Sequence, residues 1–310
     1  MSSIIRVSNL SKHFKDITAV DDLSFSVEQG DVYGFLGQNG AGKSTTIRML
    51  LTLVKPSSGS IQIFGKSLGT HRGEILKNIG AVIEKPDLYK YLSAYDNLTI
   101  FSRLSGIRPE KSIIMKQLEM VGLAERAESK VKTFSQGMKQ RIGIAVALIH
   151  DPQLIILDEP TNGLDPQGIA DMRSLIAQLS RVMGKTVLVS SHLLREIELV
   201  ANRILIIDKG KKIVEGNAAE LLDPAKTIVQ VETLDNRAAK NKLMSTKWAS
   251  FLFQQGDTLR FQMNKSDIPL LTAELVSLGI PVLSIHPRHS LEDYFLSLTT
   301  PGQHVEPIAN

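Results

Sequence analysis

The sequence of 310 residues predicts an α/β protein with a smaller α+β domain in its C-terminal part. Short β-type runs alternate with helical patterns over residues 1 to about 220, as in layered α/β domains. The run Leu154–Leu157 is continuously apolar, which is typical of a strand in a sheet covered on both faces. A glycine-rich loop near residue 40 lies between a predicted strand and a predicted helix, which is the third sign of this architecture.

The first predicted domain covers residues 1–220. Between Lys85 and Lys130 the pattern becomes helical, with prolines as interruptions. We interpret this stretch as a helical insertion between two halves of the sheet, and we expect the helical subdomain to span about residues 85–150. The predicted strands of this domain are Ile4–Val7, Leu23–Val27, Asp31–Leu36, Ser60–Phe64, Leu154–Leu157, Val187–Ser190 and Ile204–Ile207.

The residue pattern changes after Asp223, and the rest of the chain predicts a small α+β accessory domain over residues 221–300. Residues 301–310 are expected to form a flexible tail. Strand-like runs lie at Thr227–Val231, Leu259–Met263 and Val282–Ile285, and helix-like runs lie at Ile268–Leu278 and Leu291–Leu298.

Composition narrows the range of functions. The hydrophobic fraction of 43% and the charged fraction of 22% are ordinary for a soluble globular protein. A net charge of +4 is too small to indicate nucleic-acid binding, and the absence of cysteine excludes disulfides and thiolate metal sites. The longest strongly apolar runs are far shorter than the roughly 20 residues of a membrane-spanning helix, and the first residues lack the pattern of a signal peptide. We therefore expect a cytoplasmic chain with no nucleic-acid partner.

The glycine-rich loop matches the phosphate-binding pattern G-x-x-x-x-G-K-[ST]. Its glycines let the backbone curl so that successive N–H groups point at phosphate oxygens, and the start of the next helix adds a favourable field. Lys43 is expected to reach the β- and γ-phosphates, and the Ser44 hydroxyl to help hold Mg²⁺. A chance match is expected only about 0.01 times in a chain of this length. The loop comprises Gly37, Gln38, Asn39, Gly40, Ala41, Gly42, Lys43 and Ser44.

Two carboxylates end the apolar run Leu154–Leu157. Asp158 and Glu159 would be costly to bury there unless they met a cation or protons. Asp158 is therefore a candidate ligand for Mg²⁺, directly or through water, and Glu159 is a candidate general base for the attacking water. Without the phosphate loop, a strand that ends at a surface turn would explain the pair equally well.

A histidine, His192, follows the predicted strand Val187–Ser190. This strand could lie beside the strand that leads into the phosphate loop, so His192 is a candidate contact for the γ-phosphate or for the attacking water. The alternative is a lone histidine with a structural role or with no role beyond exposure.

A second helix start also offers backbone N–H groups to an anion. Ser135 and Gly137 open the predicted helix that carries Ile142–Ile149. One copy does not need two phosphate sites, whereas two copies placed head to tail do, because the helix start of one would close on the ATP held by the phosphate loop of the other. A helix that is simply capped by Ser135 is the alternative.

Together and in this order, the motifs resemble the ATP-binding subunits of ABC transporters over about residues 4–220. The resemblance implies a P-loop NTPase fold of the ABC ATPase type, ATP and Mg²⁺ as cofactors, and ATP hydrolysis. It implies roles for Phe14 as the aromatic that stacks on adenine, Gly37 to Thr45 as Walker A, Ser135, Gln136 and Gly137 as the signature motif, Leu154 to Asp158 as Walker B, Glu159 as the catalytic glutamate, Gly163 to Asp165 as the D-loop, and His192 as the switch histidine.

Two motifs depart from the family pattern. The signature motif usually reads Leu-Ser-Gly-Gly-Gln, and Gln136 replaces its first glycine, which puts the role of that glycine in doubt. Glu84 stands where the family has the glutamine of the Q-loop. An ionised carboxylate only accepts hydrogen bonds, and it adds negative charge near the γ-phosphate. Glu84 could still ligate Mg²⁺, and we expect it to alter the coupling between nucleotide and membrane partner.

These departures also narrow the resemblance. Ile83–Tyr89 and Ser135–Arg141 look like the bacitracin-resistance and lantibiotic-immunity branch of ABC-2 exporters, and Ser290–Leu296 is similar to the end of many ABC-2 ATP-binding subunits. The resemblance implies a homodimer with ATP between the two copies, which drives export through transmembrane permease subunits from a peripheral position on the inner face of the cell membrane.

Two other functions stay open at this point. An ABC-2 exporter of another load, such as a drug, a lipid or a polysaccharide, would carry the same motifs. A non-transport ABC ATPase that acts on ribosomes or DNA usually has two cassettes or long coiled-coil insertions, whereas this sequence has one cassette and no sustained heptads. No residue that we can identify encodes the transported substrate.

Three of the five tyrosines of the chain, Tyr89, Tyr91 and Tyr95, follow closely after Glu84, with Phe101 nearby. Amphipathic aromatic side chains at a surface groove would suit the docking of a short helix from the membrane partner. The alternative is that these rings pack the helical insertion itself.

Overall fold

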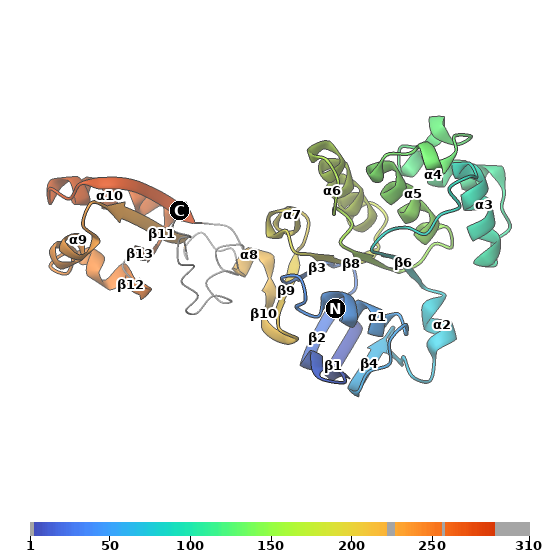
Figure 1. The fold of residues 1–310 in the computed structure, drawn as a ribbon, viewed down its shortest axis with the longest axis horizontal. Helices are drawn as coiled ribbons and strands as arrows, with labels where there is room; N and C mark the ends of the chain where they lie inside the picture. The colour runs from blue at the N-terminus through green and yellow to red at the C-terminus, as the bar shows by residue number, and fades with distance from the viewer. Residues whose placement is uncertain (1–2, 222–226, 256–257, 289–310) are drawn as a thin grey trace. The chain divides into compact units, whose positions relative to one another are not determined.

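The computed structural model describes residues 3–221, 227–255 and 258–288, and the chain divides into two compact units, residues 1–217 and 218–310 (Figure 1). Each unit has its own hydrophobic core. The predicted helix Leu291–Leu298 and the predicted tail 301–310 lie outside the described residues.

Unit 1 contains two sheets. The larger sheet has the strand order β10-β9-β3-β8-β7-β6, and the smaller one has the order β2-β1-β4-β5. In the larger sheet every neighbouring pair except β9 and β10 is parallel. The strands are β1 (Ser3–Phe14), β2 (Ile17–Glu28), β3 (Val32–Leu36), β4 (Ser58–Ile63), β5 (Lys66–Ser67), β6 (Ile79–Ile83), β7 (Leu154–Asp158), β8 (Thr186–Ser191), β9 (Arg203–Asp208) and β10 (Lys211–Asn217).

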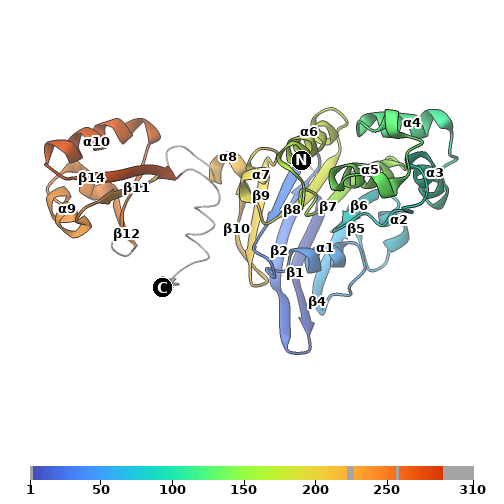
Figure 2. The ribbon, with the colours of Figure 1, turned by 45° about the horizontal axis from the view of Figure 1, so that its top comes forward.

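Helix α1 (Lys43–Leu50) packs in the core that the two sheets share (Figure 2). Ile47 and Leu50 of this helix are fully buried in one cluster with Ile5 of the smaller sheet and Leu205 of the larger one. Strands β7 and β8 are buried along their whole length, as the continuous apolar runs predict. The other helices that flank the sheets of unit 1 are α2 (Arg72–Leu76), α6 (Pro166–Arg181) and α7 (Leu194–Glu198).

A helical subdomain is inserted between β6 and β7, which are neighbours in the sheet, and this confirms the predicted insertion. It contains α3 (Ala94–Leu104), α4 (Lys111–Met120) and α5 (Gln136–Leu148), the green helices of Figure 1. Helix α3 begins with a capping box: the Ser93 hydroxyl accepts a hydrogen bond from the Asp96 N–H at 3.0 Å, and the Asp96 carboxylate accepts one from the Ser93 N–H at 3.3 Å.

Buried polar contacts tie β10 to the centre of the larger sheet. The Tyr33 hydroxyl of β3 donates to Glu215 Oε1 of β10 at 2.8 Å, and Arg203 of β9 lies 3.6 Å from the same carboxylate. Burial first, and the negative charge of Glu215 second, raise the pKa of Tyr33 well above its usual value. The hydroxyl therefore stays a hydrogen-bond donor over the physiological range of pH.

Unit 2 is a four-stranded antiparallel sheet, order β12-β13-β11-β14, with helices. Val229, Val231 and Phe261 of the sheet share a buried core with Leu271 and Leu275 of α10. The predicted small α+β fold is confirmed. The sequence analysis did not predict α9 or β12. Helix α9 has a weak apolar pattern, because it buries only two of its eight side chains. The elements are α8 (Ala218–Leu221), β11 (Thr227–Thr233), α9 (Asn236–Leu243), β12 (Leu252–Gln255), β13 (Thr258–Met263), α10 (Ile268–Ser277) and β14 (Val282–Arg288).

Candidate functional site

Four loops of unit 1 begin at the carboxyl ends of parallel strands in the larger sheet. The register pairs Ile83 with Asp158, Asp158 with Ser190, and Leu36 with Ser191. The loops that follow β3, β6, β7 and β8 therefore meet there, which is where ligands bind in open α/β sheets. The predicted phosphate loop, Q-loop residue, acidic pair and histidine all lie on these four loops or on the strand and helix ends that border them.

The phosphate loop connects β3 to α1 and depends on glycine at its last turn. Gly42 has a φ of 105°, and a Cβ atom there would lie 2.5 Å from the Ala19 carbonyl oxygen, so a larger residue does not fit. Lys43 opens α1 and is only 5% exposed. Its ammonium donates to the carbonyl oxygens of Gly37 at 2.7 Å and Gln38 at 3.2 Å. The tip of the loop, from Gln38 to Gly40, is exposed.

The three predicted catalytic side chains form one contact chain. Glu159 Oε1 lies 3.3 Å from Lys43 Nζ, and Glu159 Oε2 lies 2.7 Å from His192 Nδ1. The Glu159 side chain is 14% exposed and that of His192 is 31% exposed, so both retain access to solvent and to a ligand. A buried cation, a carboxylate and an imidazole thus meet beside the phosphate loop.

Ser190 holds the Asp158 carboxylate and the main chain of Glu159, and the sequence analysis did not identify it. Its hydroxyl donates to Asp158 Oδ1 at 2.5 Å and accepts a hydrogen bond from the Glu159 N–H at 2.9 Å. Ser190 and Asp158 are completely buried. The only local signal for this role is that Ser190 closes a buried apolar strand two residues before His192.

The residues at this edge fit a hard divalent cation such as Mg²⁺. Asp158 Oδ2 is buried and has no hydrogen-bond partner among the described residues. An orphaned carboxylate oxygen in such a place is costly unless it meets a cation or a water. Ser44, in the first turn of α1, supplies a hydroxyl of the kind that completes Mg²⁺ sites in phosphate-loop proteins.

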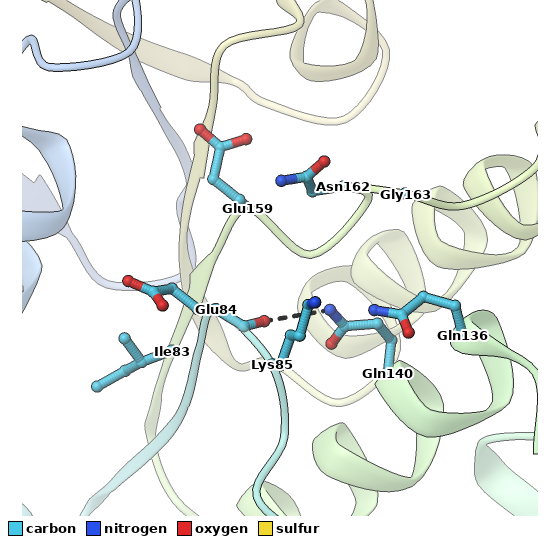
Figure 3. Close-up of a pocket in the computed structure, with 8 residues that line it drawn as sticks. All are labelled: Ile83, Glu84, Lys85, Gln136, Gln140, Glu159, Asn162 and Gly163. Atoms are coloured by element: carbon cyan, nitrogen blue, oxygen red, sulfur yellow. Dashed lines mark hydrogen bonds between the residues drawn. The ribbon is translucent and has the colours of Figure 1, made fainter.

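A pocket of about 730 Å³ joins the Q-loop, the start of α5 and the loop after β7 (Figure 3). Gln140 of α5 is 2% exposed, and its Nε2 donates to the Glu84 carbonyl oxygen at 3.2 Å. The Glu84 carboxylate forms an ion pair with Arg48 of α1. The lining residues are Ile83, Glu84, Lys85, Gln136, Gln140, Glu159, Asn162 and Gly163. Gln136 of the predicted signature motif and Glu159 therefore share one cavity.

Three predicted binding residues lie outside the contact chain around Lys43. Ser135 is exposed and caps α5, where its hydroxyl accepts from the Met138 N–H at 3.3 Å. Asp165 is exposed and caps α6. Phe14, at the end of β1, is 45% exposed, with the Lys12 ammonium 4.6 Å from the centre of its ring. All three present polar or aromatic surface to an incoming partner.

Within residues 3–221, 227–255 and 258–288, no helix has the length and apolar character that a bilayer crossing requires.

Comparison with known proteins points to one family. The family model described as ABC transporter matches residues 20–162. The chain is 42% identical over 304 residues to the bacitracin transport ATP-binding protein BcrA of Bacillus licheniformis. This match covers 97% of this chain and 99% of the relative. It is 43% identical over 212 residues to the lantibiotic transport ATP-binding protein SrtF of Streptococcus pyogenes, covering 68% of this chain and 90% of the relative.

A solved structure points to the same family. The structure of cbiO1 from Clostridium perfringens, part of the ABC transporter complex cbiONQ, superposes with a TM-score of 0.64 at 27% identity. The match covers 71% of this chain and 91% of that protein.

Proposed function

The chain belongs to the ABC transporter family as an ATP-binding and ATP-hydrolysing subunit, and we propose that it powers the export of antimicrobial peptides through a separate membrane partner. The observation that carries the site assignment is the contact chain from Lys43 through Glu159 to His192 at the end of the phosphate loop. In this proposal residues 1–220 form the nucleotide-binding domain, and residues 221–300 form an accessory domain.

The proposed chemistry assigns one task to each side chain. Lys43 binds the β- and γ-phosphates together with the N–H groups of the loop. Glu159 accepts a proton from the attacking water, and His192 orients Glu159 or contacts the γ-phosphate. Ser44 and Asp158 would hold Mg²⁺, which when bound would neutralise phosphate charge. Phosphoryl transfer in such a site depends mainly on positioning and on charge neutralisation.

Two copies are proposed to share the nucleotides. Ser135 and Asp165 are exposed helix caps outside the contact chain of Lys43, Glu159 and His192, so their side chains are accessible to the ATP or the loops of a second copy. Contacts to the γ-phosphate would favour the closed pair, and hydrolysis would remove them and reopen it. The start of α5 in one copy then supplies a second anion site for the ATP that the other copy binds.

The proposed load follows from the relatives. BcrA carries bacitracin transport in its name, and SrtF carries lantibiotic transport. We propose the same class of peptide here, with permease subunits of the ABC-2 type and a peripheral position on the cytoplasmic face of the membrane.

A growth test addresses this function. Sensitive cells that express the chain with its membrane partner should survive bacitracin or a lantibiotic at concentrations that kill the parent strain, and Lys43→Ala should abolish the protection. Lack of protection by a chain that hydrolyses ATP and binds its partner would rule out the peptide load and leave export of another substrate.

The docking surface for the partner is proposed around Tyr89 and Tyr91, just after the Q-loop. Their side chains are 51% and 77% exposed, which argues against a role in packing the helical subdomain. The Tyr89 ring meets the Phe101 ring at 6.1 Å between centroids, and the Lys132 ammonium lies 5.7 Å from the centre of the Tyr91 ring. Amphipathic aromatic rings in such positions often contribute strongly to an interface.

Replacing Tyr89 and Tyr91 together by alanine should weaken partner binding by about ten-fold or more, because hot-spot aromatics commonly contribute over 1 kcal/mol each. ATP binding by the isolated chain should stay within two-fold of wild type. Co-purification and equilibrium ATP binding measure the two effects. Loss of ATP binding would assign the rings to the packing of unit 1, and Leu104→Ala, which removes another exposed apolar side chain from the subdomain, is the matched control.

A further inference from the structure

An ion pair between the last turn of α1 and the loop after β6 has no task in the chemistry above. Arg48 Nη2 contacts Glu84 Oε1, and the two side chains are 41% and 61% exposed. A pair that is this open to water is weak, so either partner can be exchanged for another at little cost. The pair joins α1, which begins at the phosphate loop, to the loop after β6.

The position of Arg48 on α1 places it near the candidate cation ligands. Arg48 follows Ser44 by four residues, so the two side chains lie on the same face of the helix, one turn apart. Ser44 is the candidate metal ligand of this helix. The guanidinium is therefore the next charged group along that face.

Glu84 has a fixed main chain and an exposed side chain whose partner is Arg48. It follows Ile83, which is the register partner of Asp158, so its main chain lies beside the acidic pair. The Gln140 amide holds its carbonyl oxygen at 3.2 Å, and its φ of 56° is in the left-handed region. In Figure 3 the carboxylate extends away from Gln140. Rotation of the side chain alone can thus turn the carboxylate from Arg48 towards another cation.

We propose that Arg48 is a positioning residue, which holds the Glu84 carboxylate when no nucleotide is bound and competes for it with the divalent cation that accompanies ATP. The inference rests on the proposed binding of ATP with a cation held by Ser44 and Asp158. In this proposal a carboxylate is tolerated at the Q-loop position because Arg48 offsets its negative charge until a cation binds. The competition sets how much the cation adds to nucleotide affinity.

The test measures equilibrium binding of a fluorescent, non-hydrolysable ATP analogue to the full chain, once with Mg²⁺ and once with EDTA. The ratio of the two affinities reports the contribution of the cation. Because the nucleotide is more negative without Mg²⁺, loss of a positive charge can by itself raise this ratio, and the double variant below separates that effect from competition for Glu84. Arg48→Gln should raise this ratio by about two- to five-fold, since the carboxylate no longer has to leave a guanidinium. Glu84→Gln should lower it.

The double variant tests whether Arg48 acts through Glu84, because the effects of two substitutions at one contact are not additive. With Gln at position 84, Arg48→Gln should leave the ratio unchanged. Arg48→Lys, which keeps the charge, should stay near the wild-type ratio. Lys66→Gln, which breaks an ion pair of similar exposure with Glu74, should have no effect.

An unchanged ratio in Arg48→Gln, or an equal change with and without the Glu84 carboxylate, would overturn the inference while leaving the proposed function intact. Failure of the wild-type chain to bind the analogue would overturn the proposed function, and this inference with it. Thermal unfolding of each variant without nucleotide shows that the compared proteins are folded.

Discussion

Replacing Glu159 with glutamine is expected to slow ATP hydrolysis by about 100- to 10,000-fold while ATP remains bound. The amide keeps the size of the side chain but cannot accept a proton from water. It also loses the charge that lies 3.3 Å from Lys43 Nζ, whereas the contacts that would hold phosphate come from the loop and are unchanged. Phosphate release under single-turnover conditions measures the rate, and equilibrium binding measures ATP affinity.

A matched control for this prediction is Glu74→Gln, which removes an exposed carboxylate paired with Lys66 and should hydrolyse ATP at the wild-type rate. Turnover by the Glu159 variant within ten-fold of wild type would remove Glu159 from the role of general base.

Replacing Lys43 with alanine should lower ATP hydrolysis by about 100- to 1,000-fold, the range found when one charge-stabilising group is removed from an active site. ATP affinity should fall as well, because the ammonium is expected to bind phosphate before and during the reaction. Among the described residues, the Glu159 carboxylate then keeps the His192 imidazole as its ionisable partner. Steady-state hydrolysis with varied ATP separates the effects on kcat and KM.

Lys211→Ala is the control for this variant, since it removes a lysine that is 68% exposed and paired with Asp21. Its hydrolysis should equal that of wild type. Normal ATP affinity and turnover in Lys43→Ala would mean that the phosphate loop is not the nucleotide site.

Local patterns were sufficient for much of this site. The phosphate loop and the acidic pair each occupy a few consecutive residues whose chemistry depends on the strand or helix beside them, so the sequence alone predicts them. The same holds for the buried strands β7 and β8. Polar residues interrupt the pattern of β1 and β2, however, and their 12-residue lengths were underestimated. One face of a partly solvated antiparallel sheet carries such residues without ending the strand.

Contacts between distant segments were not predicted. Ser190 reaches Asp158 across 32 positions, Arg48 reaches Glu84 across 36, and Gln140 reaches the Glu84 carbonyl across 56. Each contact depends on strand order and register, which periodicity does not give. For the same reason the charge of Glu84 was considered only in relation to the nucleotide, its metal and the membrane partner, and its neighbour on α1 was missed.

The proposal that ATP is held between two copies is tested most directly by the mass of the Glu159→Gln chain in solution, measured by light scattering with ATP and with ADP. We expect a dimer with ATP and a monomer with ADP, and we expect that adding Ser135→Arg at the start of α5 keeps the chain monomeric with ATP. A Glu159→Gln chain that holds ATP tightly as a monomer would contradict the account, because the site would then be complete within one copy.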